Sequence, residues 1–205
     1  ILSPTRKQLA KLRPSWAKVV QEAGLDPETH PVEPSRREGW QSFGAIDIDR
    51  LAETPFVPDR AEANGSSIAL LLEHRAVGED QHSVLLAGDA HADVLADSVM
   101  RLLNERGVER LRVDVCKLPH HGSSGNVSRL FLEQLDCDQF LFSTSGAYFK
   151  HPDREAVARV IKFGGDAPCL VFNYRSKQNC IWDDEDLMDR YGYSVRYPVE
   201  AGIEV

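Results

Sequence analysis

An apolar strand runs directly into two histidines in the stretch LRVDVCKLPHHGS, residues 111–123. The branched and apolar residues at 111–118 predict a buried strand, and the Pro and Gly that follow predict a turn at its end. Packing explains two adjacent imidazoles at such a turn poorly, because burying both His120 and His121 would require several specific hydrogen-bond partners. We therefore expect a functional site at the carboxyl end of this strand.

Two other predicted strand ends carry similar side chains. The run LLAGD at 85–89 ends in Asp89, and KHP at 150–152 places His151 after the strand predicted at 139–143. If the three strands are parallel neighbours, their carboxyl ends meet at one edge, where open α/β sheets build their sites. Asp and His are ligands suited to zinc and related divalent ions. The first hypothesis is therefore a hydrolytic metal site.

These residues leave other interpretations open. Asp89 can cap the helix predicted after it, since a carboxylate there accepts backbone N–H groups at the positive end of the helix dipole. His120 and His121 can act as metal ligands, as a general acid or as phosphate contacts, because imidazole suits all three near neutral pH. A serine nucleophile is the rival mechanism, but the chain has no G-x-S-x-G elbow.

Strands and helices alternate from residue 66 onward, which predicts an α/β fold with largely parallel pairing. The expected strands are 66–73, 83–87, 111–118, 139–143, 169–174 and 193–197, and the expected helices are 89–106, 127–135 and 153–163. We treat 1–205 as one domain, with N-terminal helices and loops in 1–65, the αβ core in 66–175 and a tail in 176–205. Near the start, Pro14 predicts two short helices or a kink, and 43–48 resembles a strand.

The composition is that of an ordinary globular protein, with a formal net charge of −8. That charge disfavours a protein that coats DNA through many phosphate contacts, but a nuclease stays open because metal ions supply local positive charge. No apolar run reaches the roughly 20 residues that a membrane span needs, and no secretory signal opens the chain. Four cysteines without C-x-x-C pairing indicate reduced thiols. We expect a cytoplasmic protein with no membrane partner.

The order of the motifs resembles the C-terminal half of a metallo-β-lactamase-fold hydrolase, and most closely the hydrolase domains of competence-type DNA-uptake proteins. That group has an Asn-containing turn before an apolar strand, a Leu-Leu-x-Gly-Asp, a His-His-Gly-Ser after a strand, and a Ser-x-Gly loop leading to His-Pro. The matching residues here are Asn64–Ser67, Leu85–Asp89, His120–Ser123, and Ser143–Gly146 with His151–Pro152. The resemblance covers about residues 60 to 165.

The resemblance implies an αββα sandwich of which this chain is the C-terminal half. It implies that Asp89 bridges two divalent metal ions, zinc or manganese, and that His151 binds one of them. His120 and His121 would lie beside the cleft as catalytic residues that contact substrate or donate a proton. Such a binuclear centre generates a hydroxide and clamps the attacking and leaving oxygens. The expected substrate is a phosphodiester such as a nucleic acid.

The chain also departs from that family. The H-x-H-x-D-H motif that supplies most ligands of the first metal does not occur in the sequence, and Asn64 stands about where many relatives place a metal-binding His. We therefore expect an N-terminal half, a partner chain or a homo-oligomer to complete the fold and the site. The alternative is a non-catalytic interaction or regulatory domain that keeps the fold without a complete metal site.

Overall fold

A mixed six-stranded sheet lies at the centre of the computed structural model, which describes residues 1–22, 46–75, 77–78, 80–147 and 149–198. The strands follow one another in the sheet in chain order: β1 (Leu70–His74), β2 (His82–Leu86), β3 (Leu111–Lys117), β4 (Leu135–Phe142), β5 (Cys169–Phe172) and β6 (Ser194–Arg196). β1 and β2 form the expected antiparallel hairpin, and every later pair is parallel. The α/β prediction is confirmed at this level.

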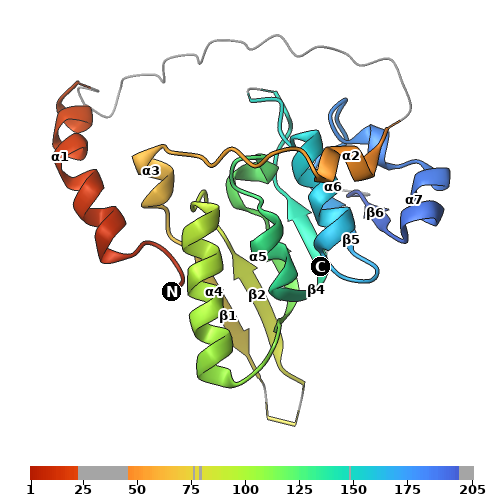
Figure 1. The fold of residues 1–205 in the computed structure, drawn as a ribbon, viewed down its shortest axis with the longest axis horizontal. Helices are drawn as coiled ribbons and strands as arrows, with labels where there is room; N and C mark the ends of the chain where they lie inside the picture. The colour runs from red at the N-terminus through yellow and green to blue at the C-terminus, as the bar shows by residue number, and fades with distance from the viewer. Residues whose placement is uncertain (23–45, 76, 79, 148, 199–205) are drawn as a thin grey trace.

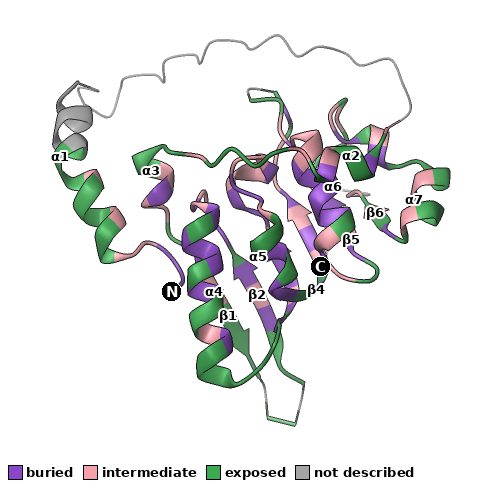
Figure 2. Ribbon diagram, in the orientation of Figure 1, coloured by how far each residue is buried: buried purple, intermediate pink, exposed green. Residues whose placement is uncertain are grey.

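Three helices connect successive parallel strands and cover one face of the sheet (Figure 1). They are α4 (Ala92–Arg106), α5 (Arg129–Glu133) and α6 (Arg154–Phe163). Strands in sequential order joined by right-handed crossovers place their connecting helices on the same side. The row of residues paired beneath them across four strands is fully buried: Leu85, Cys116, Phe140 and Leu170. Buried residues lie along these strands and on the helix surfaces turned toward them (Figure 2).

The other face of the β1–β2 hairpin is partly exposed. Leu72 is 49% exposed and Leu86 is 37% exposed. Both point away from the helix-covered face, because side chains alternate along a strand and Leu85, between Val84 and Leu86, is buried. Neighbouring exposed apolar side chains of this kind mark surface that another element can cover.

The N-terminal region differs from the expectation at two points. Of the two short helices or the kink expected at Pro14, the two separate helices are wrong, because one helix, α1 (Arg6–Glu22), runs through that residue. Pro14 is exposed, so solvent can satisfy the carbonyl that loses its N–H partner. Of the strand-like run 43–48, residues 43–45 lie outside the described part, and Ile48 begins a helix instead, α2 (Ile48–Ala52). The reason is a cap: the Asp47 side chain accepts the Arg50 N–H at 2.9 Å.

The tail adds the edge of the sheet. The acidic run 183–186 contains a helix start, as expected: Asp184 accepts the Leu187 N–H at 3.0 Å and caps α7 (Glu185–Tyr191). β6 then pairs with β5. The four cysteines are free thiols, as predicted. No helix among the described residues has the length and apolar content required to span a membrane.

Candidate active site

Three histidines meet at the carboxyl ends of β3 and β4. His120 and His121 lie in a 3₁₀ turn, η1 (Pro119–Gly122), directly after β3. His151 follows the loop after β4. The ring centroids of His120 and His151 are 5.4 Å apart, and those of His120 and His121 are 6.2 Å apart. This edge of the sheet, formed by the carboxyl ends of the parallel strands, is here called the rim. Of the four residues that the sequence placed there, the ring contacts bring together His120, His121 and His151.

Each of these imidazoles is held through its Nδ1 atom. The partner is an oxygen that can only accept a hydrogen bond: Asn126 Oδ1 at 3.2 Å for His120, Ser143 O at 2.6 Å for His121, and Asp153 Oδ1 at 3.2 Å for His151. A neutral imidazole carries one proton, so an Nδ1–H donor leaves a lone pair on Nε2. The rim therefore holds three imidazoles whose Nε2 atoms suit proton acceptance or metal binding.

The backbone at this rim is strained. His120, His121 and Lys150 have φ values of 44°, 57° and 62°, and they are the non-glycine residues with positive φ in the described chain. Left-handed backbone is uncommon for such residues, and strain of this kind clusters where function requires it. The backbone geometry of η1, here called the histidine turn, therefore favours a functional role for His120 and His121 over a role in packing.

Asp89 is not a helix cap. Its backbone N–H donates to Ser67 Oγ at 2.9 Å, and the N-cap position of α4 is taken by His91. His91 itself contacts the carbonyl of Ala61 at 2.9 Å. The charge of Asp89 acts on Lys117 at the end of β3: burial lowers the pKa of Lys117, and Asp89 opposes part of that shift. The alternative in which Asp89 serves as the cap of α4 thus fails.

The described residues do not form a complete metal site. No group of three or more His, Cys, Asp or Glu side chains in the described ranges is arranged to hold a metal ion. Asp89 and His151 have suitable donor atoms, and an Nδ1 bonded to a carboxylate is typical of a ligating histidine. However, two donors are fewer than the three or four protein ligands that zinc takes.

Asp153 links the two histidine segments. Its Oδ1 contacts His151, and its Oδ2 accepts both the backbone N–H and the hydroxyl of Ser124, each at 2.8 Å. Burial works to raise the pKa of Asp153, but the hydrogen bonds from His151 and Ser124 outweigh it and hold the pKa below its usual value. One ionised carboxylate therefore fixes His151 and the loop after His121 together.

Sequence reasoning missed two residues of this region, Asp59 and Arg159. Asp59 lies in the segment 53–61, here called the strap, which runs from α2 to α3 (Glu62–Gly65) across the carboxyl ends of the central strands (Figure 1). Its backbone N–H donates to Gly125 O at 3.0 Å. Arg159 in α6 is 3% exposed and donates to Thr54 O in the strap and to Ser124 O in residues 123–127, here called the histidine loop. Neither position has a motif or a periodic pattern that could have pointed to it.

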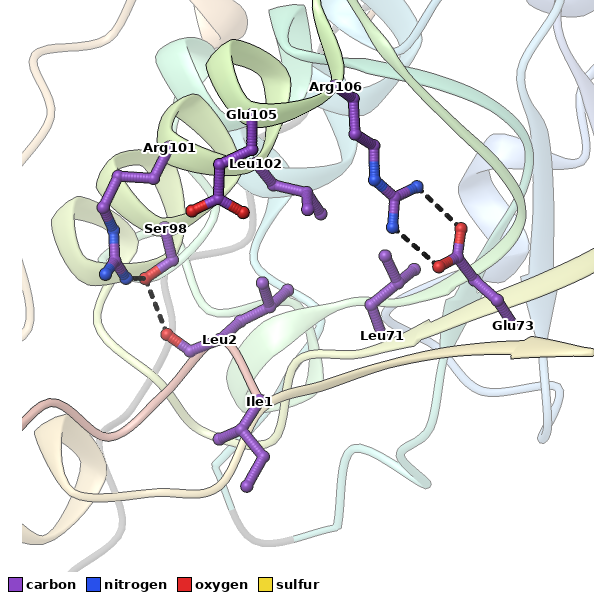
Figure 3. A pocket seen from close by; sticks show the side chains of 9 residues that line it. All are labelled: Ile1, Leu2, Leu71, Glu73, Ser98, Arg101, Leu102, Glu105 and Arg106. Atoms are coloured by element: carbon purple, nitrogen blue, oxygen red, sulfur yellow. Dashed lines mark hydrogen bonds and ion pairs between the residues drawn. The ribbon is translucent and has the colours of Figure 1, made fainter.

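A cavity of about 300 Å³ lies elsewhere, between α4, β1 and the first residues of the chain (Figure 3). Its charged lining is largely satisfied, because Arg106 donates to both carboxylate oxygens of Glu73 at 2.7 Å. None of the rim histidines lines it. We therefore assign the chemistry to the open rim and not to this cavity.

Comparisons of the sequence and the structure with known proteins found no matching family model, no matching curated protein and no matching solved structure.

Proposed function

We propose that this chain forms the C-terminal half of a metallo-β-lactamase-like αββα sandwich that hydrolyses phosphodiesters. The observation that supports the proposal is the set of three imidazoles anchored through Nδ1 at the carboxyl ends of β3 and β4. The neighbouring parallel strand, β2, leads into Asp89. Imidazoles held in this way can exchange protons with phosphate oxygens and, when protonated, place positive charge beside them.

The chain's own residues divide into two roles in this proposal. His120 and His121 accept a proton at Nε2 from the attacking group, or, when protonated, donate one to a phosphate or leaving-group oxygen. Asp89 and His151 would hold a divalent metal, zinc or manganese, with ligands added from outside the described residues. When bound, such an ion supplies Lewis acidity and a hydroxide nucleophile.

The missing ligands require a second element. An N-terminal half, a partner chain or a second copy could supply these ligands. The same element could cover the hairpin face that carries Leu72 and Leu86, which are 49% and 37% exposed. In a sandwich that face would pack against a second sheet, as inner faces do.

Metal content tests the Asp89 assignment. We expect Asp89→Ala to bind zinc or manganese at least about tenfold more weakly than the unaltered protein, because it removes one of two donors. Elemental mass spectrometry after dialysis against a metal series measures this. Asp93→Ala is the matched control, since Asp93 is exposed and bonds only to the neighbouring Val94 N–H among the described contacts. Equal metal binding in the two variants would contradict the assignment.

Turnover tests the histidine roles. The double variant His120→Asn/His121→Asn keeps a residue type that tolerates positive φ, and we expect it to cleave bis(p-nitrophenyl) phosphate at least about tenfold more slowly while retaining its metal. The control is His74→Asn/His82→Asn, an exposed cross-strand pair on the β1–β2 hairpin. Parallel loss of metal and activity would show that His120 and His121 are ligands instead.

The incomplete ligand set favours one other candidate, a non-catalytic interaction or regulatory domain that keeps the fold. That reading predicts a folded protein with no metal and no phosphodiester cleavage in any variant. The same two assays therefore separate it from the hydrolase.

A further inference from the structure

We propose that Asp59 is a positioning residue of the rim, which acts by holding His120 in the form protonated on Nδ1. The part that His120 Nε2 then plays in catalysis rests on the proposed function. The effect of Asp59 on the His120 tautomer does not. Asp59 lies in the strap, outside the part of the chain that resembles any sequence motif, and it would join the site from a distant position in the sequence.

The Asp59 carboxylate is the centre of a hydrogen-bond cluster. Its Oδ1 accepts the Ala61 N–H at 2.9 Å, and its Oδ2 accepts Asn64 Nδ2 at 2.8 Å and Asn126 Nδ2 at 3.1 Å. The same Oδ2 lies 3.5 Å from His120 Nδ1. The side chain is only 15% exposed, so the cluster rather than solvent fixes its orientation.

Asn126 presents a hydrogen-bond acceptor to His120. This fully buried side chain directs Nδ2 at three oxygens that can only accept: Asp59 Oδ2, Asp89 O at 3.3 Å and Ala90 O at 3.2 Å. Its Oδ1 is then the atom that faces His120 Nδ1, at 3.2 Å. Because Oδ1 can only accept, this contact favours the form of His120 that is protonated on Nδ1.

Asp59 strengthens that assignment through its charge. Burial works to raise the pKa of Asp59, but the hydrogen bonds from Ala61, Asn64 and Asn126 outweigh it and keep the pKa below its usual value. The carboxylate is therefore ionised at neutral pH and favours the positive end of the Nδ1–H bond beside it. One donor opposes this, since Asn64 Nδ2 lies 3.4 Å from Nδ1, but that contact is longer than the bond to Asn126.

The consequence concerns the opposite side of the ring. With Nδ1 committed to Asn126 and Asp59, Nε2 of neutral His120 carries the lone pair and points away from the cluster. His120 then serves as a proton acceptor, and it donates from Nε2 only after taking up a proton. Asp59 would thus set the direction of proton transfer without touching the substrate.

The test is the tautomer of His120, read from long-range ¹H–¹⁵N NMR spectra of protein with ¹⁵N-labelled histidine at a pH of about 8.5, two units above the pKa of imidazole in model peptides. His120→Asn identifies the signals. We expect nearly all His120 rings to be Nδ1–H in the unaltered protein, falling to roughly half or less in Asp59→Asn, which keeps the size of the side chain but removes its charge. Thermal unfolding of each variant checks that it is folded.

The control is Asp47→Asn, which changes an exposed capping carboxylate outside the cluster and should leave the His120 tautomer unchanged. An unaltered His120 tautomer in Asp59→Asn would overturn the proposal, as would a joint change in His121 and His151, which would show a merely structural effect. The measurement involves neither turnover nor metal. A protein inactive on phosphodiesters would therefore refute the proposed function and leave this inference standing.

Discussion

Gly122→Ala is expected to lower the free energy of unfolding by about 3 kcal/mol and to displace the histidine turn. Gly122 has a φ of +85°, and an added Cβ would lie 2.8 Å from Phe142 Cδ1 and 2.9 Å from Pro152 Cβ. Left-handed backbone costs a residue with a Cβ about 1–2 kcal/mol, and overpacking costs about 1–3 kcal/mol more. Neither neighbour can yield easily, because Phe142 is fully buried and stacks on Phe172 at 4.8 Å.

The effect should extend to the site, because Gly122 joins the two histidine segments. Its carbonyl accepts the Asp153 N–H at 3.0 Å, and Pro152 follows His151 directly. A shift of the turn would therefore alter the distance between His120 and His151. Urea unfolding measures the stability, and histidine NMR shifts report the displacement.

Gly107→Ala separates strain from crowding. Gly107 ends α4 with a similar φ of +65°, but an added Cβ there meets nothing within 4 Å. Gly107→Ala should therefore lower the free energy of unfolding only by the cost of left-handed backbone, about 1–2 kcal/mol. If Gly122→Ala costs no more than Gly107→Ala, the close packing around the turn is not what fixes the histidines.

The parts of the fold that the sequence predicted well are those whose signals are local. α4 shows this: its apolar face repeats at helical spacing and Gly107 ends it, so the prediction and the structure agree at its C-terminus. The rim histidines were found for a related reason. Each follows an apolar strand, and parallel strands in sequential order bring their carboxyl ends together.

What the sequence could not supply is the long-range partner. Asp59 and Gly125 are bonded although 66 positions separate them, and no periodicity marks a residue that acts through one backbone contact. At Asp89 a local pattern led to an interpretation that the tertiary structure does not bear out. A carboxylate before a helix predicts a cap, but Gly88, with a φ of +57°, turns the chain so that His91 takes that position. The local sequence pattern thus identifies which residue types lie near the site, whereas the role of each residue depends on its tertiary contacts.

Arg159 is a further case in which tertiary contacts decide the role. On sequence alone it is one charged residue in an amphipathic helix, yet the structure buries its guanidinium among carbonyl oxygens. Nη1 donates to Ser124 O at 2.7 Å and Val127 O at 3.1 Å, and Nη2 donates to Thr54 O at 3.0 Å. Burial lowers its pKa, while Glu155 and Asp153 oppose the shift. The cation thus ties the strap to the histidine loop.

Arg159→Met is expected to lower the free energy of unfolding by about 3 kcal/mol or more. Methionine keeps an unbranched apolar stem but leaves three carbonyls without their donor, and each unsatisfied group costs about 1–3 kcal/mol. Arg129→Met, which breaks an exposed ion pair with Glu133, should cost only about 0.5 kcal/mol. Urea unfolding compares them, and hydrogen exchange at the Asp59 amide, bonded to Gly125 O, should accelerate in Arg159→Met alone. If that amide stays protected while stability falls, Arg159 supports the core but not the strap, and Asp59 reaches His120 without it.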